Sequence, residues 1–252
     1  GTNTDLILVT GDEEFRYKTP TTDDPSRSTA HAVAEACERA GVDPALVERI
    51  FHGTTIATNS VIEHEGATTG MLTTEGFRDV IHIGRHRKPH NFSIQQRIPW
   101  QEDPVVERRF RKPIPERIYP PGDVTEPLDE AAVLEATDEL VASGVDAISV
   151  CYMHSYLNPE HEDRTAELIA EEYPDVFVCT SNEVVAQFRE FERFTTTAIN
   201  ASLQPKVSSY LDRISRRLED REIDAEVLIM QSNGGLASVE EVSRYPVQMV
   251  MS

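Results

Sequence analysis

The sequence predicts an α/β fold in which a mixed sheet is flanked by helices. Short apolar runs of strand length alternate with longer segments of helical periodicity along most of the chain. Glycine, proline and asparagine stand at many junctions between these runs, where turns and helix ends favour them. With 252 residues, of which 39% are hydrophobic, the chain is long enough for one large domain or two modest ones.

The first predicted elements are a hairpin and a helix. Residues 5–10 are typical of a strand, and a Gly-Asp turn could return the chain antiparallel over residues 14–19 as a hairpin. A helix follows over residues 25–40, because Asp24 is a suitable N-cap, proline occupies the first helical position and Gly41 follows the end.

The next part of the chain changes from regular to irregular. Residues 49–52 and 69–73 are predicted strands, and a helix begins within residues 57–65 between them. Residues 82–124 contain seven prolines and little helical periodicity. We expect a functional loop or a flexible excursion there, because long irregular segments inside compact domains are uncommon.

Regular structure returns after this segment. Residues 128–143 form a predicted helix, and the apolar run 147–152 is typical of a strand buried on both faces. Asn158 and Pro159 open another helix by side-chain capping and a preset φ, and residues 176–179 form the next strand.

The last part of the chain is predicted to begin a second domain. Residues 190–221 form one long helical stretch, in which Pro205 marks a break or a new start. Residues 227–230 form a strand that runs into a glycine-rich turn. We therefore place one domain over residues 1–180 and the truncated beginning of another over residues 181–252.

The composition is strongly acidic, and this excludes several classes of partner. The chain has 24 Lys and Arg against 44 Asp and Glu, for a formal net charge of -20. Such a surface repels phosphate backbones and anionic lipids, so we expect no nucleic-acid or membrane partner. No apolar run approaches the roughly 20 residues that cross a bilayer, and no secretory signal is visible. Three isolated cysteines indicate reduced, buried thiols in a cytoplasmic protein.

The scarcity of lysine beside so many acids also suggests a protein adapted to concentrated salt. Only Lys18, Lys88, Lys112 and Lys206 are lysines. We predict that the thermal unfolding midpoint keeps rising with sodium or potassium chloride above the concentration at which ordinary charge screening saturates. A midpoint that stays flat beyond that range would remove the halophilic interpretation.

Three small-residue loops could bind a phosphate or a carbonyl oxygen. They are residues 1–5, 52–59 and 232–235, which combine glycine with hydroxyl, amide or carboxylate side chains beside predicted strands. Each has an ordinary alternative: a polar chain start, a helix-capping turn and a tight turn, respectively. If they act as sites, we expect the three loops to converge around one ligand.

Two further clusters have both a functional and an ordinary interpretation. Asp79, His82, His86 and His90 recur at helical spacing that could bind a transition metal, but Gly84 and Pro89 interrupt that helix. Solvated loop histidines are the favoured interpretation. Residues 189–193 are either an exposed helix start or a group of charges facing a cleft. No GxSxG elbow and no Walker A loop occurs, so serine-hydrolase and P-loop interpretations lose support.

Taken in chain order, six stretches resemble the hydantoinase A/5-oxoprolinase family. They are GTNTD (1–5), HGTTIATN (52–59), TEGFRD with IGR (74–79 and 83–85), HSYLNPEH (154–161), REFER with TTT (189–193 and 195–197) and MQSNGGL (230–236). Each stretch alone is a weak signal. Their shared order across essentially the whole chain makes the resemblance specific.

The resemblance implies an actin-like, sugar-kinase-like (ribonuclease H-like) ATPase fold. It also implies ATP- and Mg²⁺-dependent opening of a cyclic amide such as a hydantoin or 5-oxoproline, by an oligomer that works with a hydantoinase B-type subunit. Phosphorylating the oxygen of an unstrained amide makes that oxygen a better leaving group. The alternatives are an ATP-using subunit of an acetone- or acetophenone-carboxylase-like complex and a non-catalytic scaffold fragment.

The resemblance also assigns roles by position. The implied catalytic residues are Asp5, His52, Arg85, Glu190 and Arg193, with Asp5 also as the metal ligand. The implied nucleotide-binding residues are Gly1, Thr2, Thr4, Asp5, Asn233, Gly234 and Gly235. The implied substrate-binding residues are Gly53, Thr54, Thr55, Asn59 and Arg189. The family usually has a second glycine before Gly1 and further glycine-rich loops after Ser252, so we expect the front portion of a longer protein, inactive alone.

Overall fold

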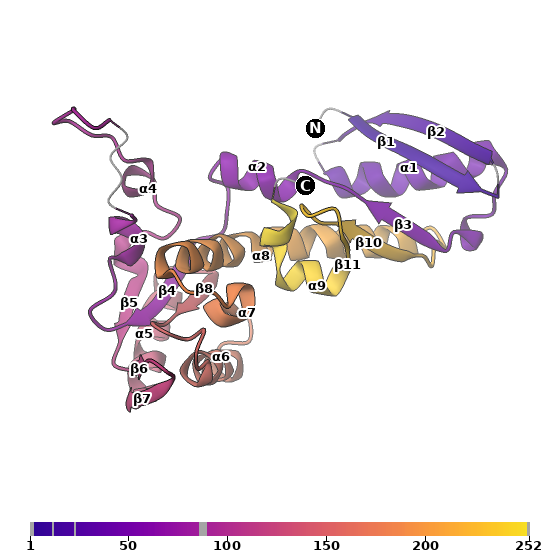
Figure 1. Cartoon of the computed structure of the whole chain (residues 1–252). Helices are drawn as coiled ribbons and strands as arrows, with labels where there is room; N and C mark the ends of the chain where they lie inside the picture. The colour runs from indigo at the N-terminus through magenta and orange to yellow at the C-terminus, as the bar shows by residue number, and fades with distance from the viewer. Residues whose placement is uncertain (1–2, 12, 23, 86–89, 251–252) are drawn as a thin grey trace. The chain divides into compact units, whose positions relative to one another are not determined.

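The computed structural model describes residues 3–11, 13–22, 24–85 and 90–250, which divide into two compact units (Figure 1). Unit 1 comprises residues 1–59 and 206–252, and unit 2 comprises residues 60–205. The described chain combines parallel and antiparallel strand pairs with helices between the strands. This confirms the predicted α/β class with mixed sheets flanked by helices.

Unit 2 is built on a parallel sheet of four strands. Their order across the sheet is β5 (Arg111–Ile114), β4 (Thr69–Thr74), β8 (Ala147–Cys151) and β9 (Phe177–Thr180). Every residue of β4 and β8 is buried, as the apolar run in β8 predicts for a strand covered on both faces. Helices α5 (Glu130–Ala142) and α6 (Glu160–Glu172) contact each other and the sheet.

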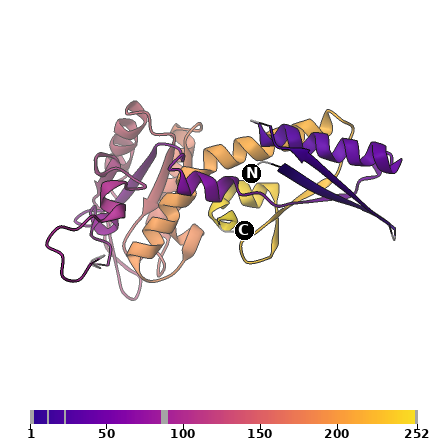
Figure 2. The ribbon, with the colours of Figure 1, turned by 90° about the horizontal axis from the view of Figure 1, so that it is seen from above.

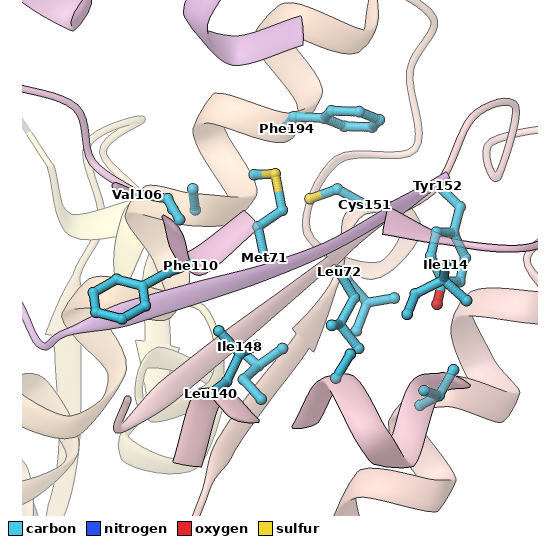
Figure 3. Close-up of a cluster of buried hydrophobic side chains, with 14 of the residues drawn as sticks. Met71, Leu72, Val106, Phe110, Ile114, Leu140, Ile148, Cys151, Tyr152 and Phe194 are labelled. Atoms are coloured by element: carbon cyan, nitrogen blue, oxygen red, sulfur yellow. The ribbon is translucent and has the colours of Figure 1, made fainter. Parts of the chain in front are cut away.

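The main core of unit 2 lies on both faces of this sheet. Figure 3 shows Met71 of β4 pointing toward Phe194, while Leu72 points to the opposite face with Leu140 of α5 and Ile148 of β8. All five side chains are buried. Burial of one such side chain stabilises a fold by about 1.5–3 kcal/mol, so alternate packing on two faces anchors β4 as a central strand.

Two predicted helices of unit 2 are confirmed. Helix α5 starts at Glu130, two residues later than predicted, and α6 starts at Glu160, directly after the predicted Asn158-Pro159 opening. Asp129 accepts a hydrogen bond from the Ala132 amide at 3.0 Å, which ends the preceding loop and begins α5 at Glu130. Asn158 accepts one from the Glu160 amide at 3.1 Å in front of α6. Both side chains satisfy amides that a helix start leaves without intrahelical partners.

The expectation that residues 82–124 are irregular is wrong in part. They contain α4 (Pro99–Glu102), a 3₁₀ turn η2 (Arg108–Phe110) and strand β6 (Arg117–Tyr119), which pairs with β7 (Asp123–Glu126). They also contain β5, an edge strand of the main sheet that includes Pro113. Proline lacks a donor and is tolerated on a sheet edge, so a proline-rich sequence does not exclude an edge strand.

Unit 1 begins with the predicted hairpin and helix. Strand β1 (Asn3–Thr10) pairs antiparallel with β2 (Glu13–Pro20), and α1 (Pro25–Ala40) contacts both strands. The side chain of Asp24 accepts a hydrogen bond from the Ser26 amide at 3.1 Å, and Gly41 ends the helix at φ 66°. The N-cap, the helix bounds and the C-terminal glycine all match the prediction.

A second sheet completes unit 1. Strand β10 (Glu226–Met230) pairs in parallel with β3 (Arg49–His52) and antiparallel with β11 (Leu236–Ser238). Helix α2 (Ile56–Ile62) follows β3, and α9 (Val239–Arg244) follows β11. Figures 1 and 2 show that β1 and β3 run in opposite directions.

Helix α8 (Glu190–Glu219) is continuous, so the predicted break or restart at Pro205 is wrong. Proline removes one hydrogen bond of the helix ladder. Leu203 and Val207 on either side of Pro205 are fully buried, and this packing retains the helical path. The contact division between the units falls directly after Pro205. The division into sequence domains 1–180 and 181–252 stays a prediction.

The remaining short elements are α3 (Val80–Ile83), α7 (Ser181–Val185) and the 3₁₀ turns η1 (Pro44–Leu46) and η3 (Pro246–Met249). Cys37, Cys151 and Cys179 are free and buried, as predicted. Within the described ranges, no helix is both long enough and apolar enough to cross a bilayer.

Candidate functional site

A cavity of about 650 Å³ in unit 1 is lined by seven of the predicted site residues. It is bordered by the first part of β1, by β3, by one face of α1 and by the turn between β3 and α2. Its lining includes Thr4, Asp5, His52, Gly53, Thr54, Thr55 and Asn59. The fold therefore brings together two predicted loops that lie about 50 residues apart in the chain.

His52 stands at the end of β3 and is oriented by a tyrosine. Its Nε2 atom lies 2.8 Å from the hydroxyl oxygen of Tyr210 on α8. Burial lowers the pKa of His52 to about 4, so the imidazole is neutral near pH 7. Burial also raises the pKa of the Tyr210 phenol. The pair therefore offers a fixed polar group to the cavity without positive charge.

The turn after His52 combines a structural and a possible ligand-binding role. The Ile56 amide donates to the Thr54 hydroxyl at 3.4 Å, and the Asn59 side chain donates to the Thr55 hydroxyl at 3.4 Å. These contacts match the helix-capping alternative. A Cβ added at Gly53 would lie 3.2 Å from the Met230 sulfur, so the Met230 side chain would have to shift slightly to admit it. The cavity is nevertheless bordered by Gly53, Thr54, Thr55 and Asn59.

Asp5, the predicted metal ligand, is paired with a lysine. Its carboxylate lies 3.0 Å from Lys18 Nζ across the β1–β2 hairpin, and its side chain is 69% exposed. Within the described ranges, no group of three or more His, Cys, Asp or Glu side chains is placed to hold a metal ion. The single carboxylate of Asp5 fits Mg²⁺ binding only if nucleotide phosphates supply most of the ligands of the ion.

Among the described residues, the predicted nucleotide-binding residues Asn233, Gly234 and Gly235 do not line this cavity. Gly1 and Thr2 lie outside the described residues. Asn233, Gly234 and Gly235 form the turn between β10 and β11, which matches the tight-turn alternative. The Gly235 amide donates to the Asn233 side chain at 2.7 Å, and Gly234 has φ 84°. From this loop only Gln231 is among the described residues that line the cavity.

The remaining predicted site residues border a second cavity, of about 360 Å³, in unit 2. It is formed by the residues after α3, the turn after β8 and the start of α8. Its lining residues are Gly84, Arg85, Met153, His154, Tyr156 and residues 188–193. Arg85, Arg189, Glu190 and Arg193 thus lie together, as the cleft interpretation of residues 189–193 predicts.

Arg193 is buried, and its donors are used by the protein itself. Its guanidinium donates to the carbonyl of Gln187 at 2.8 Å, the carbonyl of Tyr152 at 3.0 Å and the hydroxyl of Ser181 at 3.1 Å. Ser181 in turn donates to Glu162 at 2.7 Å. These contacts tie the start of α8 to the turn after β8. They favour a positioning role over the predicted catalytic one.

Glu162 is the buried acid beneath this turn. It accepts hydrogen bonds from the Tyr152 and Asn182 amides, each at 2.8 Å, in addition to Ser181. Burial raises its pKa to about 7, while the hydrogen bonds and Arg193 oppose that rise. The Tyr152–Asn158 turn is therefore held from below by a network of fixed donors and acceptors.

The cavity-facing charges above this network are more accessible. Arg85 forms an ion pair with Glu192. Arg189 is exposed, has its guanidinium 5.2 Å from the Phe188 ring centroid and forms no salt bridge within the described residues. Arg189 and His154 both have left-handed backbones, with φ 81° and 62°. Strained backbones of this kind often occur at functional sites.

His154 and Tyr156 are cavity residues to which the sequence analysis assigns no role. They belong to the HSYLNPEH stretch, directly after buried strand β8. Ligands in α/β proteins bind beyond the carboxyl ends of parallel strands, and this position is the signal that could have identified them. Tyr210 lacks such a signal, because a tyrosine inside a long helix resembles any core residue.

Asp79 and the nearby histidines do not form the alternative metal site in the described part of the chain. Arg108 donates twice to the Asp79 carboxylate, at 2.9 Å each, and this lowers the pKa of Asp79. The carbonyl of His82 accepts hydrogen bonds from Trp100 and Gln101. His86 lies outside the described residues.

Comparison with protein families gives the decisive context for both cavities. The family model for the hydantoinase/oxoprolinase N-terminal region matches residues 1–173, and the hydantoinase/oxoprolinase model matches residues 193–252. The chain belongs to the hydantoinase/oxoprolinase family.

Individual relatives include subunits of two kinds of enzyme. The chain is 34% identical to the caprolactamase subunit alpha of Pseudomonas jessenii, over 94% of this chain and 35% of the relative. It is 32% identical to the acetophenone carboxylase gamma subunit of Aromatoleum aromaticum, over 95% of this chain and 35% of the relative. The chain thus spans about a third of the length of these relatives.

A solved structure supports the same assignment. The crystal structure of the ATP-dependent caprolactamase from Pseudomonas jessenii matches with a TM-score of 0.81 and 31% identity, over 98% of this chain and 37% of that chain. The family resemblance and the fold are confirmed. That caprolactamase is named as ATP-dependent, and the two relatives above are named as subunits.

Proposed function

We propose that this chain is the amino-terminal part of a subunit that uses ATP to open a small cyclic amide of the hydantoin or 5-oxoproline type. The observation that carries the proposal is the convergence of Thr4 and Asp5 with residues 52–55 on one cavity of a family member. Relatives named as an ATP-dependent caprolactamase support amide chemistry with ATP.

We assign the polar end of the unit 1 cavity to the nucleotide and reacting phosphate. Thr4, Thr54 and Thr55 offer hydroxyl donors, and Asn59 offers an amide. Neutral His52, fixed by Tyr210, orients a polar group by hydrogen bonding. Asp5 would assist Mg²⁺, which the phosphates would mainly hold. Gly1, Thr2 and residues 233–235 remain proposed nucleotide contacts. Gly53, Thr54, Thr55 and Asn59 remain proposed substrate contacts.

We assign the unit 2 cavity to recognition of a small polar ring. Arg189 presents an exposed guanidinium, and Glu190 and Arg85 add a carboxylate and a second guanidinium. Phe188 and Tyr156 supply aromatic surface for the apolar part of a ring. Arg193 positions this group from beneath. Together these side chains would bind and orient the substrate rather than react with it.

ATP supplies a phosphoryl group to the amide oxygen, which makes the amide carbon more susceptible to water. The net reaction consumes one ATP and two waters per ring and releases ADP, phosphate and the ring-opened acid, which is an N-carbamoyl amino acid from a hydantoin and glutamate from 5-oxoproline. A hydantoinase B-type subunit and a longer polypeptide would complete the enzyme. An oligomeric, cytoplasmic assembly remains part of the proposal.

A carboxylase subunit is the second candidate, favoured by the similarity to the acetophenone carboxylase gamma subunit. Both candidates use ATP to activate an oxygen, so the shared loops do not separate them. Their co-substrates do, because a carboxylase requires bicarbonate and a ketone.

The test is substrate-dependent ADP release by the complete polypeptide with its partner subunit, using hydantoin, 5-oxoproline and caprolactam in turn. We expect one ring opened per ADP. Replacing Thr54 by valine should lower kcat/KM for ATP by about tenfold to a hundredfold, since a phosphate-facing donor is lost. Arg189→Met should mainly raise the KM of the cyclic amide.

The matched control is Thr10→Val, at the exposed end of β1 and outside the residues that border the cavity. Its kinetics should equal those of the unmodified enzyme. Bicarbonate-dependent turnover with a ketone would favour the carboxylase. A complete complex that binds no nucleotide would leave the scaffold interpretation.

A further inference from the structure

The HSYLNPEH stretch contains a second histidine, His161, which lines neither of the two cavities. It is the second residue of α6 and is buried. Its Nδ1 atom lies 2.8 Å from the carboxylate of Glu116, which stands between β5 and β6 and is also buried. A buried carboxylate destabilises a fold unless its oxygens are hydrogen-bonded. The other oxygen of Glu116 therefore needs a donor as well.

That donor is the hydroxyl of Thr74, the fully buried last residue of β4. A threonine hydroxyl has one hydrogen and two lone pairs. Because its hydrogen is directed at Glu116, a lone pair accepts the Met153 amide, whose nitrogen lies 2.8 Å from the hydroxyl oxygen. We use the name Thr74 network for this buried chain of hydrogen bonds, which runs through His161, Glu116, Thr74 and the Met153 amide.

The Thr74 network ends at the wall of the unit 2 cavity, where Met153 and His154 are lining residues. The residue before them is held by a different set of contacts. The Tyr152 amide donates to Glu162 at 2.8 Å, and the Tyr152 carbonyl accepts from Arg193 at 3.0 Å. Two consecutive amides at the end of β8 are thus fixed by two buried carboxylates, one directly and one through a threonine hydroxyl.

His154 has a backbone conformation that depends on such contacts. Its φ is 62°, in the left-handed region that residues with a side chain rarely adopt. A strained conformation of this kind persists where the surrounding structure fixes it from several sides. Here both preceding amides are fixed, and the His154 carbonyl accepts a hydrogen bond from the Leu157 amide at 2.8 Å. Without an acceptor for the Met153 amide, His154 would be free to relax to an ordinary φ.

The position of His154 affects one side of the cavity. Its ring centroid lies 6.2 Å from that of Tyr156, and the Tyr156 centroid lies 5.2 Å from the Arg193 guanidinium. We call His154 and Tyr156 the aromatic wall, because both line the cavity. A shift of His154 would displace this wall, whereas the charged residues at the start of α8 would keep their helical backbone.

We propose that Thr74 and Glu116, anchored by His161, are positioning residues for the unit 2 cavity. They act through the Met153 amide and hold the aromatic wall where it can contact a cyclic amide. This inference rests on the proposed function of the cavity and deepens it, because binding of the ring then depends on residues outside the cavity lining. Binding of ATP, which we assign to unit 1, does not depend on them.

The first test measures the kinetics of the complete polypeptide with its partner subunit, using whichever of hydantoin, 5-oxoproline and caprolactam it opens. Thr74→Val removes the hydroxyl and keeps the side-chain shape, and Thr74→Ser keeps the hydroxyl. Thr137→Val is the matched control, since Thr137 is also fully buried in unit 2 and its hydroxyl donates to the Val133 carbonyl at 2.8 Å, within α5.

We expect Thr74→Val to raise the KM of the cyclic amide about tenfold, while kcat and the KM of ATP change by less than about twofold. Thr74→Ser should restore the KM, and Thr137→Val should leave it unchanged. A merely structural role of Thr74 would lower the active fraction, and so kcat, without changing either KM. That result, equal kinetics of the two valine variants, or a serine variant that does not restore the KM would overturn the proposal.

Glu116 is tested by its coupling to Thr74. Glu116→Leu should raise the KM of the cyclic amide as Thr74→Val does, and the double variant should raise it no further, because the same network is already broken. The double variant replaces both partners of one hydrogen bond by apolar groups, which proteins tolerate better than the loss of one partner. An unchanged KM in Glu116→Leu, or a higher KM in the double variant than in Thr74→Val, would overturn the role of Glu116.

Hydrogen–deuterium exchange separates a failure of this proposal from a failure of the proposed function. It is measured on the complete polypeptide without substrate, on fragments that cover residues 152–158. Exchange there should be about tenfold faster in Thr74→Val than in the unmodified protein or in Thr137→Val. If no cyclic amide is opened but exchange is faster, the proposed function fails and the positioning of the turn stands. Unchanged exchange in Thr74→Val would overturn the positioning role, whatever the turnover.

Discussion

Replacing Arg193 by methionine is expected to lower the free energy of unfolding by about 3–5 kcal/mol, because three acceptors lose a charged hydrogen-bond donor at about 1–3 kcal/mol each. The substitution removes three hydrogen bonds from the guanidinium, to Gln187, Tyr152 and Ser181. It also leaves Glu162 without the positive charge that opposes its desolvation. Methionine keeps much of the side-chain volume, so the deficit reports on lost polar contacts.

The loss of unfolding free energy caused by Arg193→Met should grow as the pH rises. Burial already raises the pKa of Glu162 to about 7, and loss of Arg193 raises that pKa further. A group whose folded-state pKa lies above its unfolded value binds more protons when folded, so stability is lost as pH rises. The difference between the variant and the unmodified chain should therefore be larger at pH 8 than at pH 5.5.

Urea unfolding at the two pH values measures this difference. Arg189→Met is the matched control, because it removes the same group from an exposed position four residues earlier. Its effect should stay within about 0.5 kcal/mol, as for ordinary surface substitutions. Equal losses of unfolding free energy for R193M and R189M would show that the buried contacts of Arg193 contribute little to stability.

His52 is expected to make unit 1 less stable as the pH falls. Burial lowers its pKa from the usual 6.5 to about 4 in the folded state. The unfolded chain therefore binds a proton between pH 6.5 and 4 that the folded chain does not bind. The stability is fully present above pH 6.5 and is lost toward pH 4, by about 3 kcal/mol for a shift of this size.

The contribution is isolated by comparing the unmodified chain with His52→Gln. The difference in unfolding free energy between them should fall by about 3 kcal/mol from pH 7 to pH 4, while groups common to both cancel. Glutamine keeps a polar group near the Tyr210 hydroxyl. Urea unfolding gives the free energies, and a histidine NMR titration gives the pKa directly.

His31→Gln is the control, because His31 is exposed on α1. The free-energy difference between that variant and the unmodified chain should stay flat over the same range. A flat difference for His52→Gln as well would contradict the desolvation of His52.

Local sequence determined the regular elements whose signals are complete within a few residues. Asp24, Pro25 and Gly41 define both ends of α1, because capping and left-handed termination act over one turn. The apolar run of β8 predicts a strand buried on both faces. The ordered family stretches identify the loops. The fold brings Thr4 and Asp5 to residues 52–55, whereas residues 232–235, the third loop expected to converge, do not line the same cavity.

The tertiary structure decided the features that depend on contacts between residues far apart in the sequence. Strand β5 exists because β4 offers a ladder at the sheet edge, although Pro113 argues locally against a strand. Helix α8 continues through Pro205 because buried residues on both sides hold it. The contacts of Arg193 with Gln187, Tyr152 and Ser181 favour positioning over catalysis, and the pairing of Asp5 with Lys18 appears only in the folded hairpin. Such outcomes depend on burial and long-range packing, whose energies exceed local propensities and leave no short sequence pattern.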